Sequence, residues 1–273
     1  MNKNIKLSNG ETIPMVGFGV FQTESGIVTE NAVVTALKAG YGHIDTAKIY
    51  ANEESVGRGI KKSGVAREDI YLTTKLWNDD IRAGNAREAL KASFSKLDVD
   101  YLDLYLIHWP AVGFEEAWLV LEEYYKAGKI KTIGVSNFHK HHLDELKRVA
   151  TIMPMVNQIE SNPYFNNSEL VKYCQSLGIV VEAWSPLGGT GSHIFENPTL
   201  IELGKKYGKD VAQIIIRWHL QNNIVALVKS VNDDRIKSNI NVYDFELSKE
   251  DMDIINSLER NQRSGADPET FDF

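Results

Sequence analysis

The chain has 273 residues, of which 43% are hydrophobic and 25% charged, and its formal net charge is −7. This composition is typical of a folded globular protein, and the negative charge argues against a nucleic-acid partner. No apolar run approaches the roughly 20 residues that cross a bilayer, and the N-terminus lacks the apolar stretch of a signal peptide. We therefore expect a cytoplasmic protein with no membrane partner, in which the single cysteine, Cys174, packs inside the protein.

Short apolar runs alternate with longer segments of helical periodicity along almost the whole chain. This alternation builds parallel sheets from βαβ units. An Asn9-Gly10 turn signal near the start predicts a β-hairpin. Eight strands are predicted after it, at residues 16–20, 43–45, 71–75, 102–108, 131–136, 155–159, 180–184 and 224–228. The sequence therefore predicts one α/β domain over residues 1–273, a (β/α)8 TIM barrel with an N-terminal hairpin and extra helices near the C-terminus.

An open doubly wound sheet is the competing architecture, because it shows the same alternation and also binds dinucleotides. Its G-x-G-x-x-G fingerprint is incomplete in this chain. The G-x-G pairs at 17–19 and 57–59 have Gln22 and Lys62 where the third glycine belongs. A closed barrel is favoured, and in such a barrel the active site lies at the C-terminal ends of the strands.

Four polar residues stand at or just after those strand ends, namely Asp45, Tyr50, Lys75 and His108. Each has an ordinary structural explanation when taken alone, such as capping a helix, packing in a loop, or reaching solvent. In one barrel, however, all four converge on the same opening. They occur in the motifs HIDTAKIY, TTKLW and LYLIHWP, which are followed by GVSNF. In this order the motifs resemble the aldo-keto reductase family over nearly the whole chain.

The resemblance implies a catalytic tetrad in an enzyme that reduces aldehydes, 2-oxoaldehydes or keto sugars with NADPH. Tyr50 would donate the proton to the carbonyl oxygen as general acid. A phenol has a pKa of about 10, and the ammonium of Lys75 is expected to lower it toward working pH. Asp45 would keep Lys75 charged and oriented, and His108 would bind the carbonyl oxygen. The chemistry requires no metal.

The segment KSVNDDRIKSN, directly after the eighth strand, stands where barrels often bind phosphate. From spacing alone, a solvated helix start explains it equally well. The resemblance implies that it holds the adenosine 2′-phosphate and so favours NADPH over NADH, although Val228 replaces the proline usual in the family. Arg235 and Asn239, four residues apart on a helix, are expected to address one ligand group. The full assignment is Lys229, Ser230, Val231, Arg235 and Asn239.

The nicotinamide half of the cofactor has its own candidates in the later strands. Amide and hydroxyl groups suit its carboxamide, an aromatic residue would stack on its ring, and the segment after the seventh strand would offer backbone groups to the pyrophosphate. A buried core tryptophan is the alternative for the aromatic residue. These candidates are Ser136, Asn137 and Gln158 for the carboxamide, Trp184 for the ring, and Ser185, Leu187 and Gly188 for the pyrophosphate.

Phe21, Trp77 and Trp109 follow strand ends and would form apolar walls around His108 in the substrate pocket. Core packing is the alternative for Phe21. The chain ends in the short tail RSGADPETFDF, which resembles bacterial members of the family and predicts an open pocket. The resemblance also implies a monomer.

His139, His141 and His142 form the most metal-like cluster of the sequence. We do not expect a metal there, because no carboxylate or cysteine stands at ligand spacing and Asn137 is a plausible N-cap for an exposed first helical turn. Two other functions stay open at this stage. One is a regulatory barrel that binds NADPH without turnover, which the intact tetrad disfavours. The other is a metal-dependent lyase or hydrolase, for which Asp45 and His108 supply too few ligands.

Overall fold

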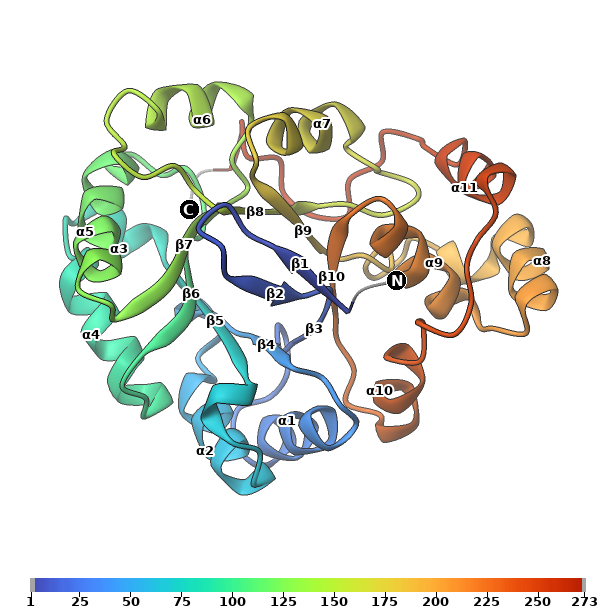
Figure 1. Cartoon of the computed structure of the whole chain (residues 1–273), viewed down its shortest axis with the longest axis horizontal. Helices are drawn as coiled ribbons and strands as arrows, with labels where there is room; N and C mark the ends of the chain where they lie inside the picture. The colour runs from blue at the N-terminus through green and yellow to red at the C-terminus, as the bar shows by residue number, and fades with distance from the viewer. Residues whose placement is uncertain (1–2, 272–273) are drawn as a thin grey trace.

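A computed structural model describes residues 3–271 and contains a closed barrel of eight parallel strands. Figure 1 looks down the barrel, whose strands form the centre of the molecule. Around the barrel the order is β10-β3-β4-β5-β6-β7-β8-β9, so neighbours in sequence are neighbours in space. The strands are β3 (Val16–Gly19), β4 (His43–Asp45), β5 (Tyr71–Leu76), β6 (Leu102–Ile107), β7 (Ile130–Ser136), β8 (Val156–Glu160), β9 (Val180–Trp184) and β10 (Ile224–Val228). The predicted (β/α)8 barrel is confirmed, and no strand end differs from its prediction by more than one residue.

The predicted N-terminal hairpin is also present and closes one end of the barrel. Its strands β1 (Asn4–Lys6) and β2 (Thr12–Pro14) pair antiparallel around a turn in which Gly10 has a φ of 93°. The hairpin side chains Leu7 and Ile13 are buried among residues from the barrel strands. In Figure 1 the hairpin crosses the barrel opening that faces the viewer. Because this end is plugged, a site for a small molecule has to form at the opposite rim.

The helices surround the barrel, as Figure 1 shows. They are α1 (Ile27–Lys38), α2 (Glu53–Ser63), α3 (Asn78–Arg82), α4 (Ala86–Leu97), α5 (Phe114–Lys126), α6 (Lys140–Leu146), α7 (Ser168–Ser176), α8 (Pro198–Tyr207), α9 (Val211–Gln221), α10 (Asp233–Asn239) and α11 (Lys249–Asn256), with single 3-10 turns η1 (Lys48–Tyr50), η2 (Arg67–Asp69) and η3 (Ile194–Glu196). The extra helices near the C-terminus are thereby confirmed. Within the described chain, every helix is too short or too polar to span a bilayer.

The two G-x-G pairs of the sequence are sites of close packing. A Cβ atom at Gly57 would lie 2.4 Å from the backbone oxygen of Leu97, where α2 crosses the end of α4. A Cβ atom at Gly17 would lie 2.5 Å from Leu227 Cδ2 and 2.7 Å from His43 Nδ1, inside the barrel. Real Cβ atoms essentially never approach neighbours this closely. These glycines are therefore required by packing.

After α11 the chain returns across the rim opposite the hairpin, and we call residues 260–271 the C-terminal tail. The tail begins where the Arg260 amide donates to the Tyr164 carbonyl at 3.0 Å. It continues past the Glu160 carboxylate, which accepts hydrogen bonds from Ser264, and reaches Phe271. The last two residues of the predicted tail, 272 and 273, lie outside the described residues.

Candidate active site

The four predicted tetrad residues meet at this rim. The Lys75 ammonium nitrogen lies 2.7 Å from Asp45 Oδ1 and 3.4 Å from the Tyr50 hydroxyl oxygen, and it also donates to the Thr46 carbonyl at 2.9 Å. The His108 ring stands edge-on to the Tyr50 ring, with centroids 5.8 Å apart. Lys75 has no exposed surface. Its charge is therefore balanced by Asp45 rather than by water.

Strand register explains why these side chains meet. In the parallel pair β4–β5, Asp45 lies opposite Thr73, so Lys75 follows two residues later on the same face of β5. Tyr50 is carried by η1, which ends at Ala51 in the left-handed conformation, with a φ of 54°. The buried Asn52 ties this loop to the barrel, because its amide donates to the Val20 carbonyl at 3.0 Å and its oxygen accepts from the Thr46 hydroxyl at 2.8 Å.

Burial and the neighbouring charges together set the pKa values of Lys75 and Tyr50. Burial works to lower the pKa of Lys75, but the Asp45 carboxylate and the Tyr50 oxygen outweigh it and raise this pKa. For Tyr50, burial of the hydroxyl end raises the pKa more than the Lys75 ammonium lowers it, and the Asp45 charge adds to the rise. The prediction of a lowered Tyr50 pKa was therefore wrong, because it counted the ammonium and left out burial. The phenol stays protonated at neutral pH.

His108 is neutral at neutral pH. Burial, together with the charge of Lys75, lowers its pKa well below the usual range. Its Nδ1 atom is buried and has no hydrogen-bond partner among the described residues. Because Nδ1 is enclosed by protein, the other ring nitrogen of His108, Nε2, is the one that can bind an oxygen atom of a substrate.

A second polar layer lies below the tetrad, inside the barrel. The Gln158 amide donates to Asp45 Oδ2 at 3.0 Å and to Glu182 Oε2 at 2.9 Å, so it holds the tetrad carboxylate from below. Burial, with repulsion from Asp45, raises the pKa of Glu182 to about 8. His43 lies 3.8 Å from Glu182, and burial lowers its pKa to about 3. Glu182 was not among the residues predicted from the sequence, although a carboxylate inside the apolar strand VVEAW is a signal of this kind of buried network.

The residues predicted at the nicotinamide end are also brought together. The Ser136 hydroxyl donates to the Gln158 carbonyl at 2.8 Å, and the Asn137 amide donates to Ser136 Oγ at 3.1 Å and to the His108 carbonyl at 3.0 Å. The Trp184 indole donates to Asn137 Oδ1 at 2.8 Å. Among the described residues, no donor reaches the Gln158 side-chain oxygen. That oxygen is available to a carboxamide N–H.

The predicted phosphate end lies past β10. Ser185 and Gly188 form a turn at the end of β9, in which the Gly188 amide donates to the Ser185 carbonyl at 2.9 Å, with Leu187 between them. Lys229 and Arg235 are exposed, and neither forms an ion pair with another residue of the described chain. Two cationic side chains that have no carboxylate partner among the described residues can together bind a phosphate group.

The other residues of that segment differ in surroundings. Val231 is 54% exposed, whereas Asn239 is buried. Ser230 is partly exposed, and its hydroxyl oxygen accepts a hydrogen bond from the Asn232 backbone N–H at 3.0 Å. Arg235 and Asn239 therefore share a helix but not the same exposure. That both contact one ligand group stays a prediction.

Aromatic side chains surround the tetrad on the outer side. The Phe21 ring lies 5.0 Å from that of Tyr50, and the Trp77 ring lies 5.2 Å from that of His108. The Trp109 ring is nearly parallel to two others, with centroid distances of 6.5 Å to His108 and 4.0 Å to Phe271. Phe271 was not predicted at this rim, because nothing in the tail sequence shows where the tail folds back.

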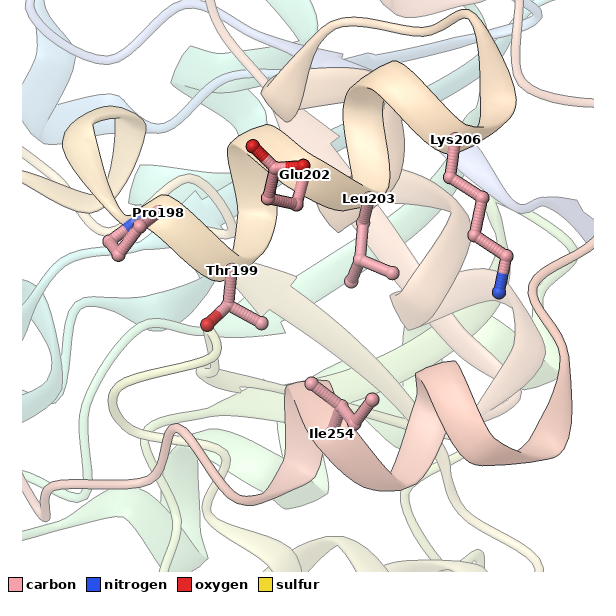
Figure 2. A pocket seen from close by; sticks show the side chains of 6 residues that line it. All are labelled: Pro198, Thr199, Glu202, Leu203, Lys206 and Ile254. Carbon is pink, nitrogen blue, oxygen red and sulfur yellow. The ribbon is translucent and has the colours of Figure 1, made fainter.

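A surface hollow elsewhere does not compete with this site. It lies between α8 and α11, where Leu203 and Ile254 face each other and Glu202 and Lys206 stand on α8 (Figure 2). The Glu202 carboxylate is paired with Lys205 at 2.8 Å, and the Lys206 ammonium with Asp251 at 2.7 Å. Its charged groups already have partners and it contains no tetrad residue.

The histidine cluster differs from its prediction in two respects. The N-cap of α6 is His139, and Asn137 instead has a φ of 64° and binds barrel groups. A carboxylate does complete the cluster, since Glu269 of the tail lies 2.5 Å from His139 Nδ1. The expectation that no carboxylate is available was wrong, because this one comes from 130 positions along the chain.

Comparison with known proteins agrees with this geometry. The Aldo/keto reductase family matches residues 16–260. The chain is 47% identical to the glyoxal reductase of Bacillus subtilis, over 100% of this chain and 99% of that protein. It is 43% identical to the methylglyoxal reductase DkgA of Escherichia coli, over 98% and 97% of the two chains. The crystal structure of a Bombyx mori aldo-keto reductase in complex with NADP superimposes with a TM-score of 0.90 at 39% identity, covering 95% of this chain and 94% of that one.

Proposed function

Since the chain belongs to the Aldo/keto reductase family, we propose that it is an NADPH-dependent reductase that converts aldehydes, 2-oxoaldehydes or keto sugars to alcohols, with Tyr50 as general acid. The observation that carries the proposal is the buried Asp45–Lys75–Tyr50 chain of contacts beside a neutral His108. A bound reduced nicotinamide would supply the hydride. The residues of this chain supply the proton and hold the carbonyl group.

Tyr50 donates its hydroxyl proton to the carbonyl oxygen as negative charge develops there. Its raised pKa keeps that proton in place until a substrate arrives. The Lys75 ammonium, 3.4 Å away, then stabilises the phenolate left behind. Asp45 keeps the lysine charged, and Gln158 keeps Asp45 in place.

His108 orients the substrate. A neutral imidazole donates one N–H to the carbonyl oxygen without competing with Tyr50 as the proton source. The aromatic rim of Phe21, Trp77 and Trp109 would shield the bound carbonyl group from water. Methylglyoxal is a fitting first substrate, because the similar proteins include a glyoxal reductase and a methylglyoxal reductase.

For the cofactor, we assign the carboxamide to Ser136, Asn137 and Gln158, and the ring to Trp184. The turn at Ser185, Leu187 and Gly188 is assigned to the pyrophosphate. Lys229 and Arg235, with Ser230, Val231 and Asn239 beside them, are assigned to the adenosine 2′-phosphate. The unpaired charges of Lys229 and Arg235 support NADPH over NADH. The NADP complex of the Bombyx mori enzyme supports the same choice.

We also propose that the chain forms a single domain over residues 1–273 and that the protein is a cytoplasmic monomer. Light scattering of the purified protein tests the monomeric state.

The proposal is tested with a carbonyl panel of methylglyoxal, an aromatic aldehyde and a keto sugar, each assayed with NADPH and NADH side by side. We expect turnover of at least one substrate, with NADPH preferred. Tight NADPH binding without turnover of any carbonyl compound would instead favour the regulatory barrel.

A further inference from the structure

Three side chains of types that can ligate a metal meet at the active-site rim, outside the tetrad. His141 and His142 come from the first turn of α6, and Glu269 comes from the C-terminal tail. One ligand atom from each lies within 4.8 Å of the other two. We propose that His141, His142 and Glu269 bind a divalent transition-metal ion of the Zn²⁺ type, and that this ion fastens the C-terminal tail across the barrel mouth.

The donor set fits such an ion. Two imidazoles and one carboxylate suit zinc and its first-row neighbours, and three protein ligands leave a fourth position for water. The His141 Nε2 and Glu269 Oε2 atoms are 3.6 Å apart. Two donors bound to one tetrahedral zinc ion at ~2.0–2.2 Å are separated by roughly 3.4 Å. This pair therefore already has nearly the spacing that an ion requires.

The carboxylate is held in position by its neighbours. Arg263 donates to His139 Nε2 at 3.3 Å, so the ring proton of a neutral His139 is on Nδ1. From there it is donated to Glu269 Oε1 at 2.5 Å. The other carboxylate oxygen, Oε2, faces His141 and is left for the ion. A residue that orients a metal-binding carboxylate in this way commonly strengthens the site.

The His142 ring lies against that of His141, with centroids 3.8 Å apart. Its Nδ1 atom accepts a hydrogen bond from the His139 backbone N–H at 3.1 Å. Binding of the ion at His142 exchanges this hydrogen bond for a metal–nitrogen bond.

Fixing Glu269 also fixes the residues that cover the mouth. Phe271, two residues further on, stacks on Trp109 with an interplanar angle of 22°, and Trp109 in turn stacks on His108. At the other end of the tail, a Cβ atom on Gly265 would lie 2.4 Å from the Trp184 ring. The C-terminal tail thus lies over both predicted halves of the site. An ion that holds the C-terminal tail in place slows the exchange of substrate and product. This consequence rests on the proposed function. Binding of the ion is independent of the proposed function.

The direct test uses the full-length protein stripped with a chelator and titrated with Zn²⁺ by calorimetry, with no cofactor or substrate present. We expect one ion per chain. Glu269→Gln and His141→Ala should each lower the affinity at least tenfold. His193→Ala is the matched control, because His193 is also exposed and lies 3.1 Å from a carboxylate, that of Glu196, in the same protein. The Zn²⁺ affinity of the His193→Ala variant should equal that of the parent. Equal affinity of the Glu269→Gln variant and the parent, or no binding, overturns the site.

Fastening of the tail is measured separately, by trypsin cleavage after Arg263. Zn²⁺ should slow this cleavage in the parent and in His193→Ala, and leave it unchanged in Glu269→Gln. Bound Zn²⁺ without protection of the tail overturns the clamp. Turnover of methylglyoxal is the last readout, in which Zn²⁺ should lower kcat in the parent but not in Glu269→Gln. Absence of all turnover contradicts the proposed function, while the calorimetric and proteolytic results still decide the site.

Discussion

The hydroxyl oxygen of Tyr50 lies 3.4 Å from the ammonium nitrogen of Lys75, and that ammonium has no contact with solvent. The two groups act in opposite directions on the phenol. Burial makes it harder to ionise, and the positive charge makes the phenolate easier to form. Burial dominates, so the proton is retained at neutral pH. The ammonium becomes important when the proton leaves for a carbonyl oxygen.

Replacing Lys75 by Met should lower kcat with methylglyoxal by about 10²- to 10³-fold, because the phenolate loses the charge that stabilises it. It should also destabilise the fold by about 3–5 kcal/mol, since Asp45 becomes a buried carboxylate without its partner. Steady-state kinetics and urea unfolding measure the two effects. Adding Asp45→Asn should restore much of the stability and none of the activity. A double variant with parental activity would contradict the role given to Lys75.

Replacing Glu182 by Gln should make stability less dependent on pH. The pKa of Glu182 is raised to about 8 in the folded protein from a usual 4.5, so its contribution to stability is complete below pH 4.5 and is lost as pH rises toward 8. The glutamine side chain of the variant cannot ionise but still accepts from Gln158. Urea unfolding should show the variant gaining several kcal/mol over the parent between pH 5 and 8. The exposed Glu202→Gln is the control, and a gain that does not grow with pH would count against a buried neutral carboxyl.

Lys229→Met and Arg235→Leu should each raise the KM for NADPH about 10- to 100-fold, the effect of losing one charge-assisted hydrogen bond of ~1.5–3 kcal/mol. The KM for NADH should hardly change, because NADH has no 2′-phosphate. Lys237→Met removes an exposed cation from the same helix and should leave both values unchanged. Equal increases of the KM for NADPH and for NADH would show that Lys229 and Arg235 do not bind the 2′-phosphate.

Gly57→Ala should destabilise the protein by about 1–3 kcal/mol, because the new methyl group meets the Leu97 carbonyl oxygen at 2.4 Å. Gly42→Ala is a fair comparison, since its Cβ would meet Pro14 Cγ only at 3.5 Å, an ordinary contact. Thermal unfolding of both variants measures the difference. Similar midpoints for the two would show that α2 moves away from α4 without cost.

The barrel was predictable because strands buried on both faces read as short apolar runs, and β4 to β10 all coincide with such runs. Asp45, Lys75 and His108 were predictable for a related reason, since a polar residue ending a buried strand has to lie at a rim. The resemblance to a known family then supplied the roles. Tyr50 was predictable as a residue of the loop after β4, and the Asn52 side chain holds this loop against the barrel.

What the sequence did not reveal depends on contacts between distant parts of the chain. The tail places Glu269 beside His139 and Phe271 on Trp109, and neither contact has a local signature. The direction of the Tyr50 pKa depends on how much protein encloses its hydroxyl, which spacing cannot show. The start of α6 was predicted at the wrong residue, because the Asn137 side chain binds the barrel and His139 caps the helix.

The most direct test of the account is a single turnover of the Tyr50→Phe variant, loaded with NADPH and mixed with methylglyoxal. The variant keeps the ring and removes only the hydroxyl group. We predict that NADPH binds as tightly as in the parent, while hydride transfer slows by at least about 10²-fold because no acid protonates the carbonyl oxygen. A transfer rate equal to that of the parent would contradict the assignment of Tyr50 as the proton donor.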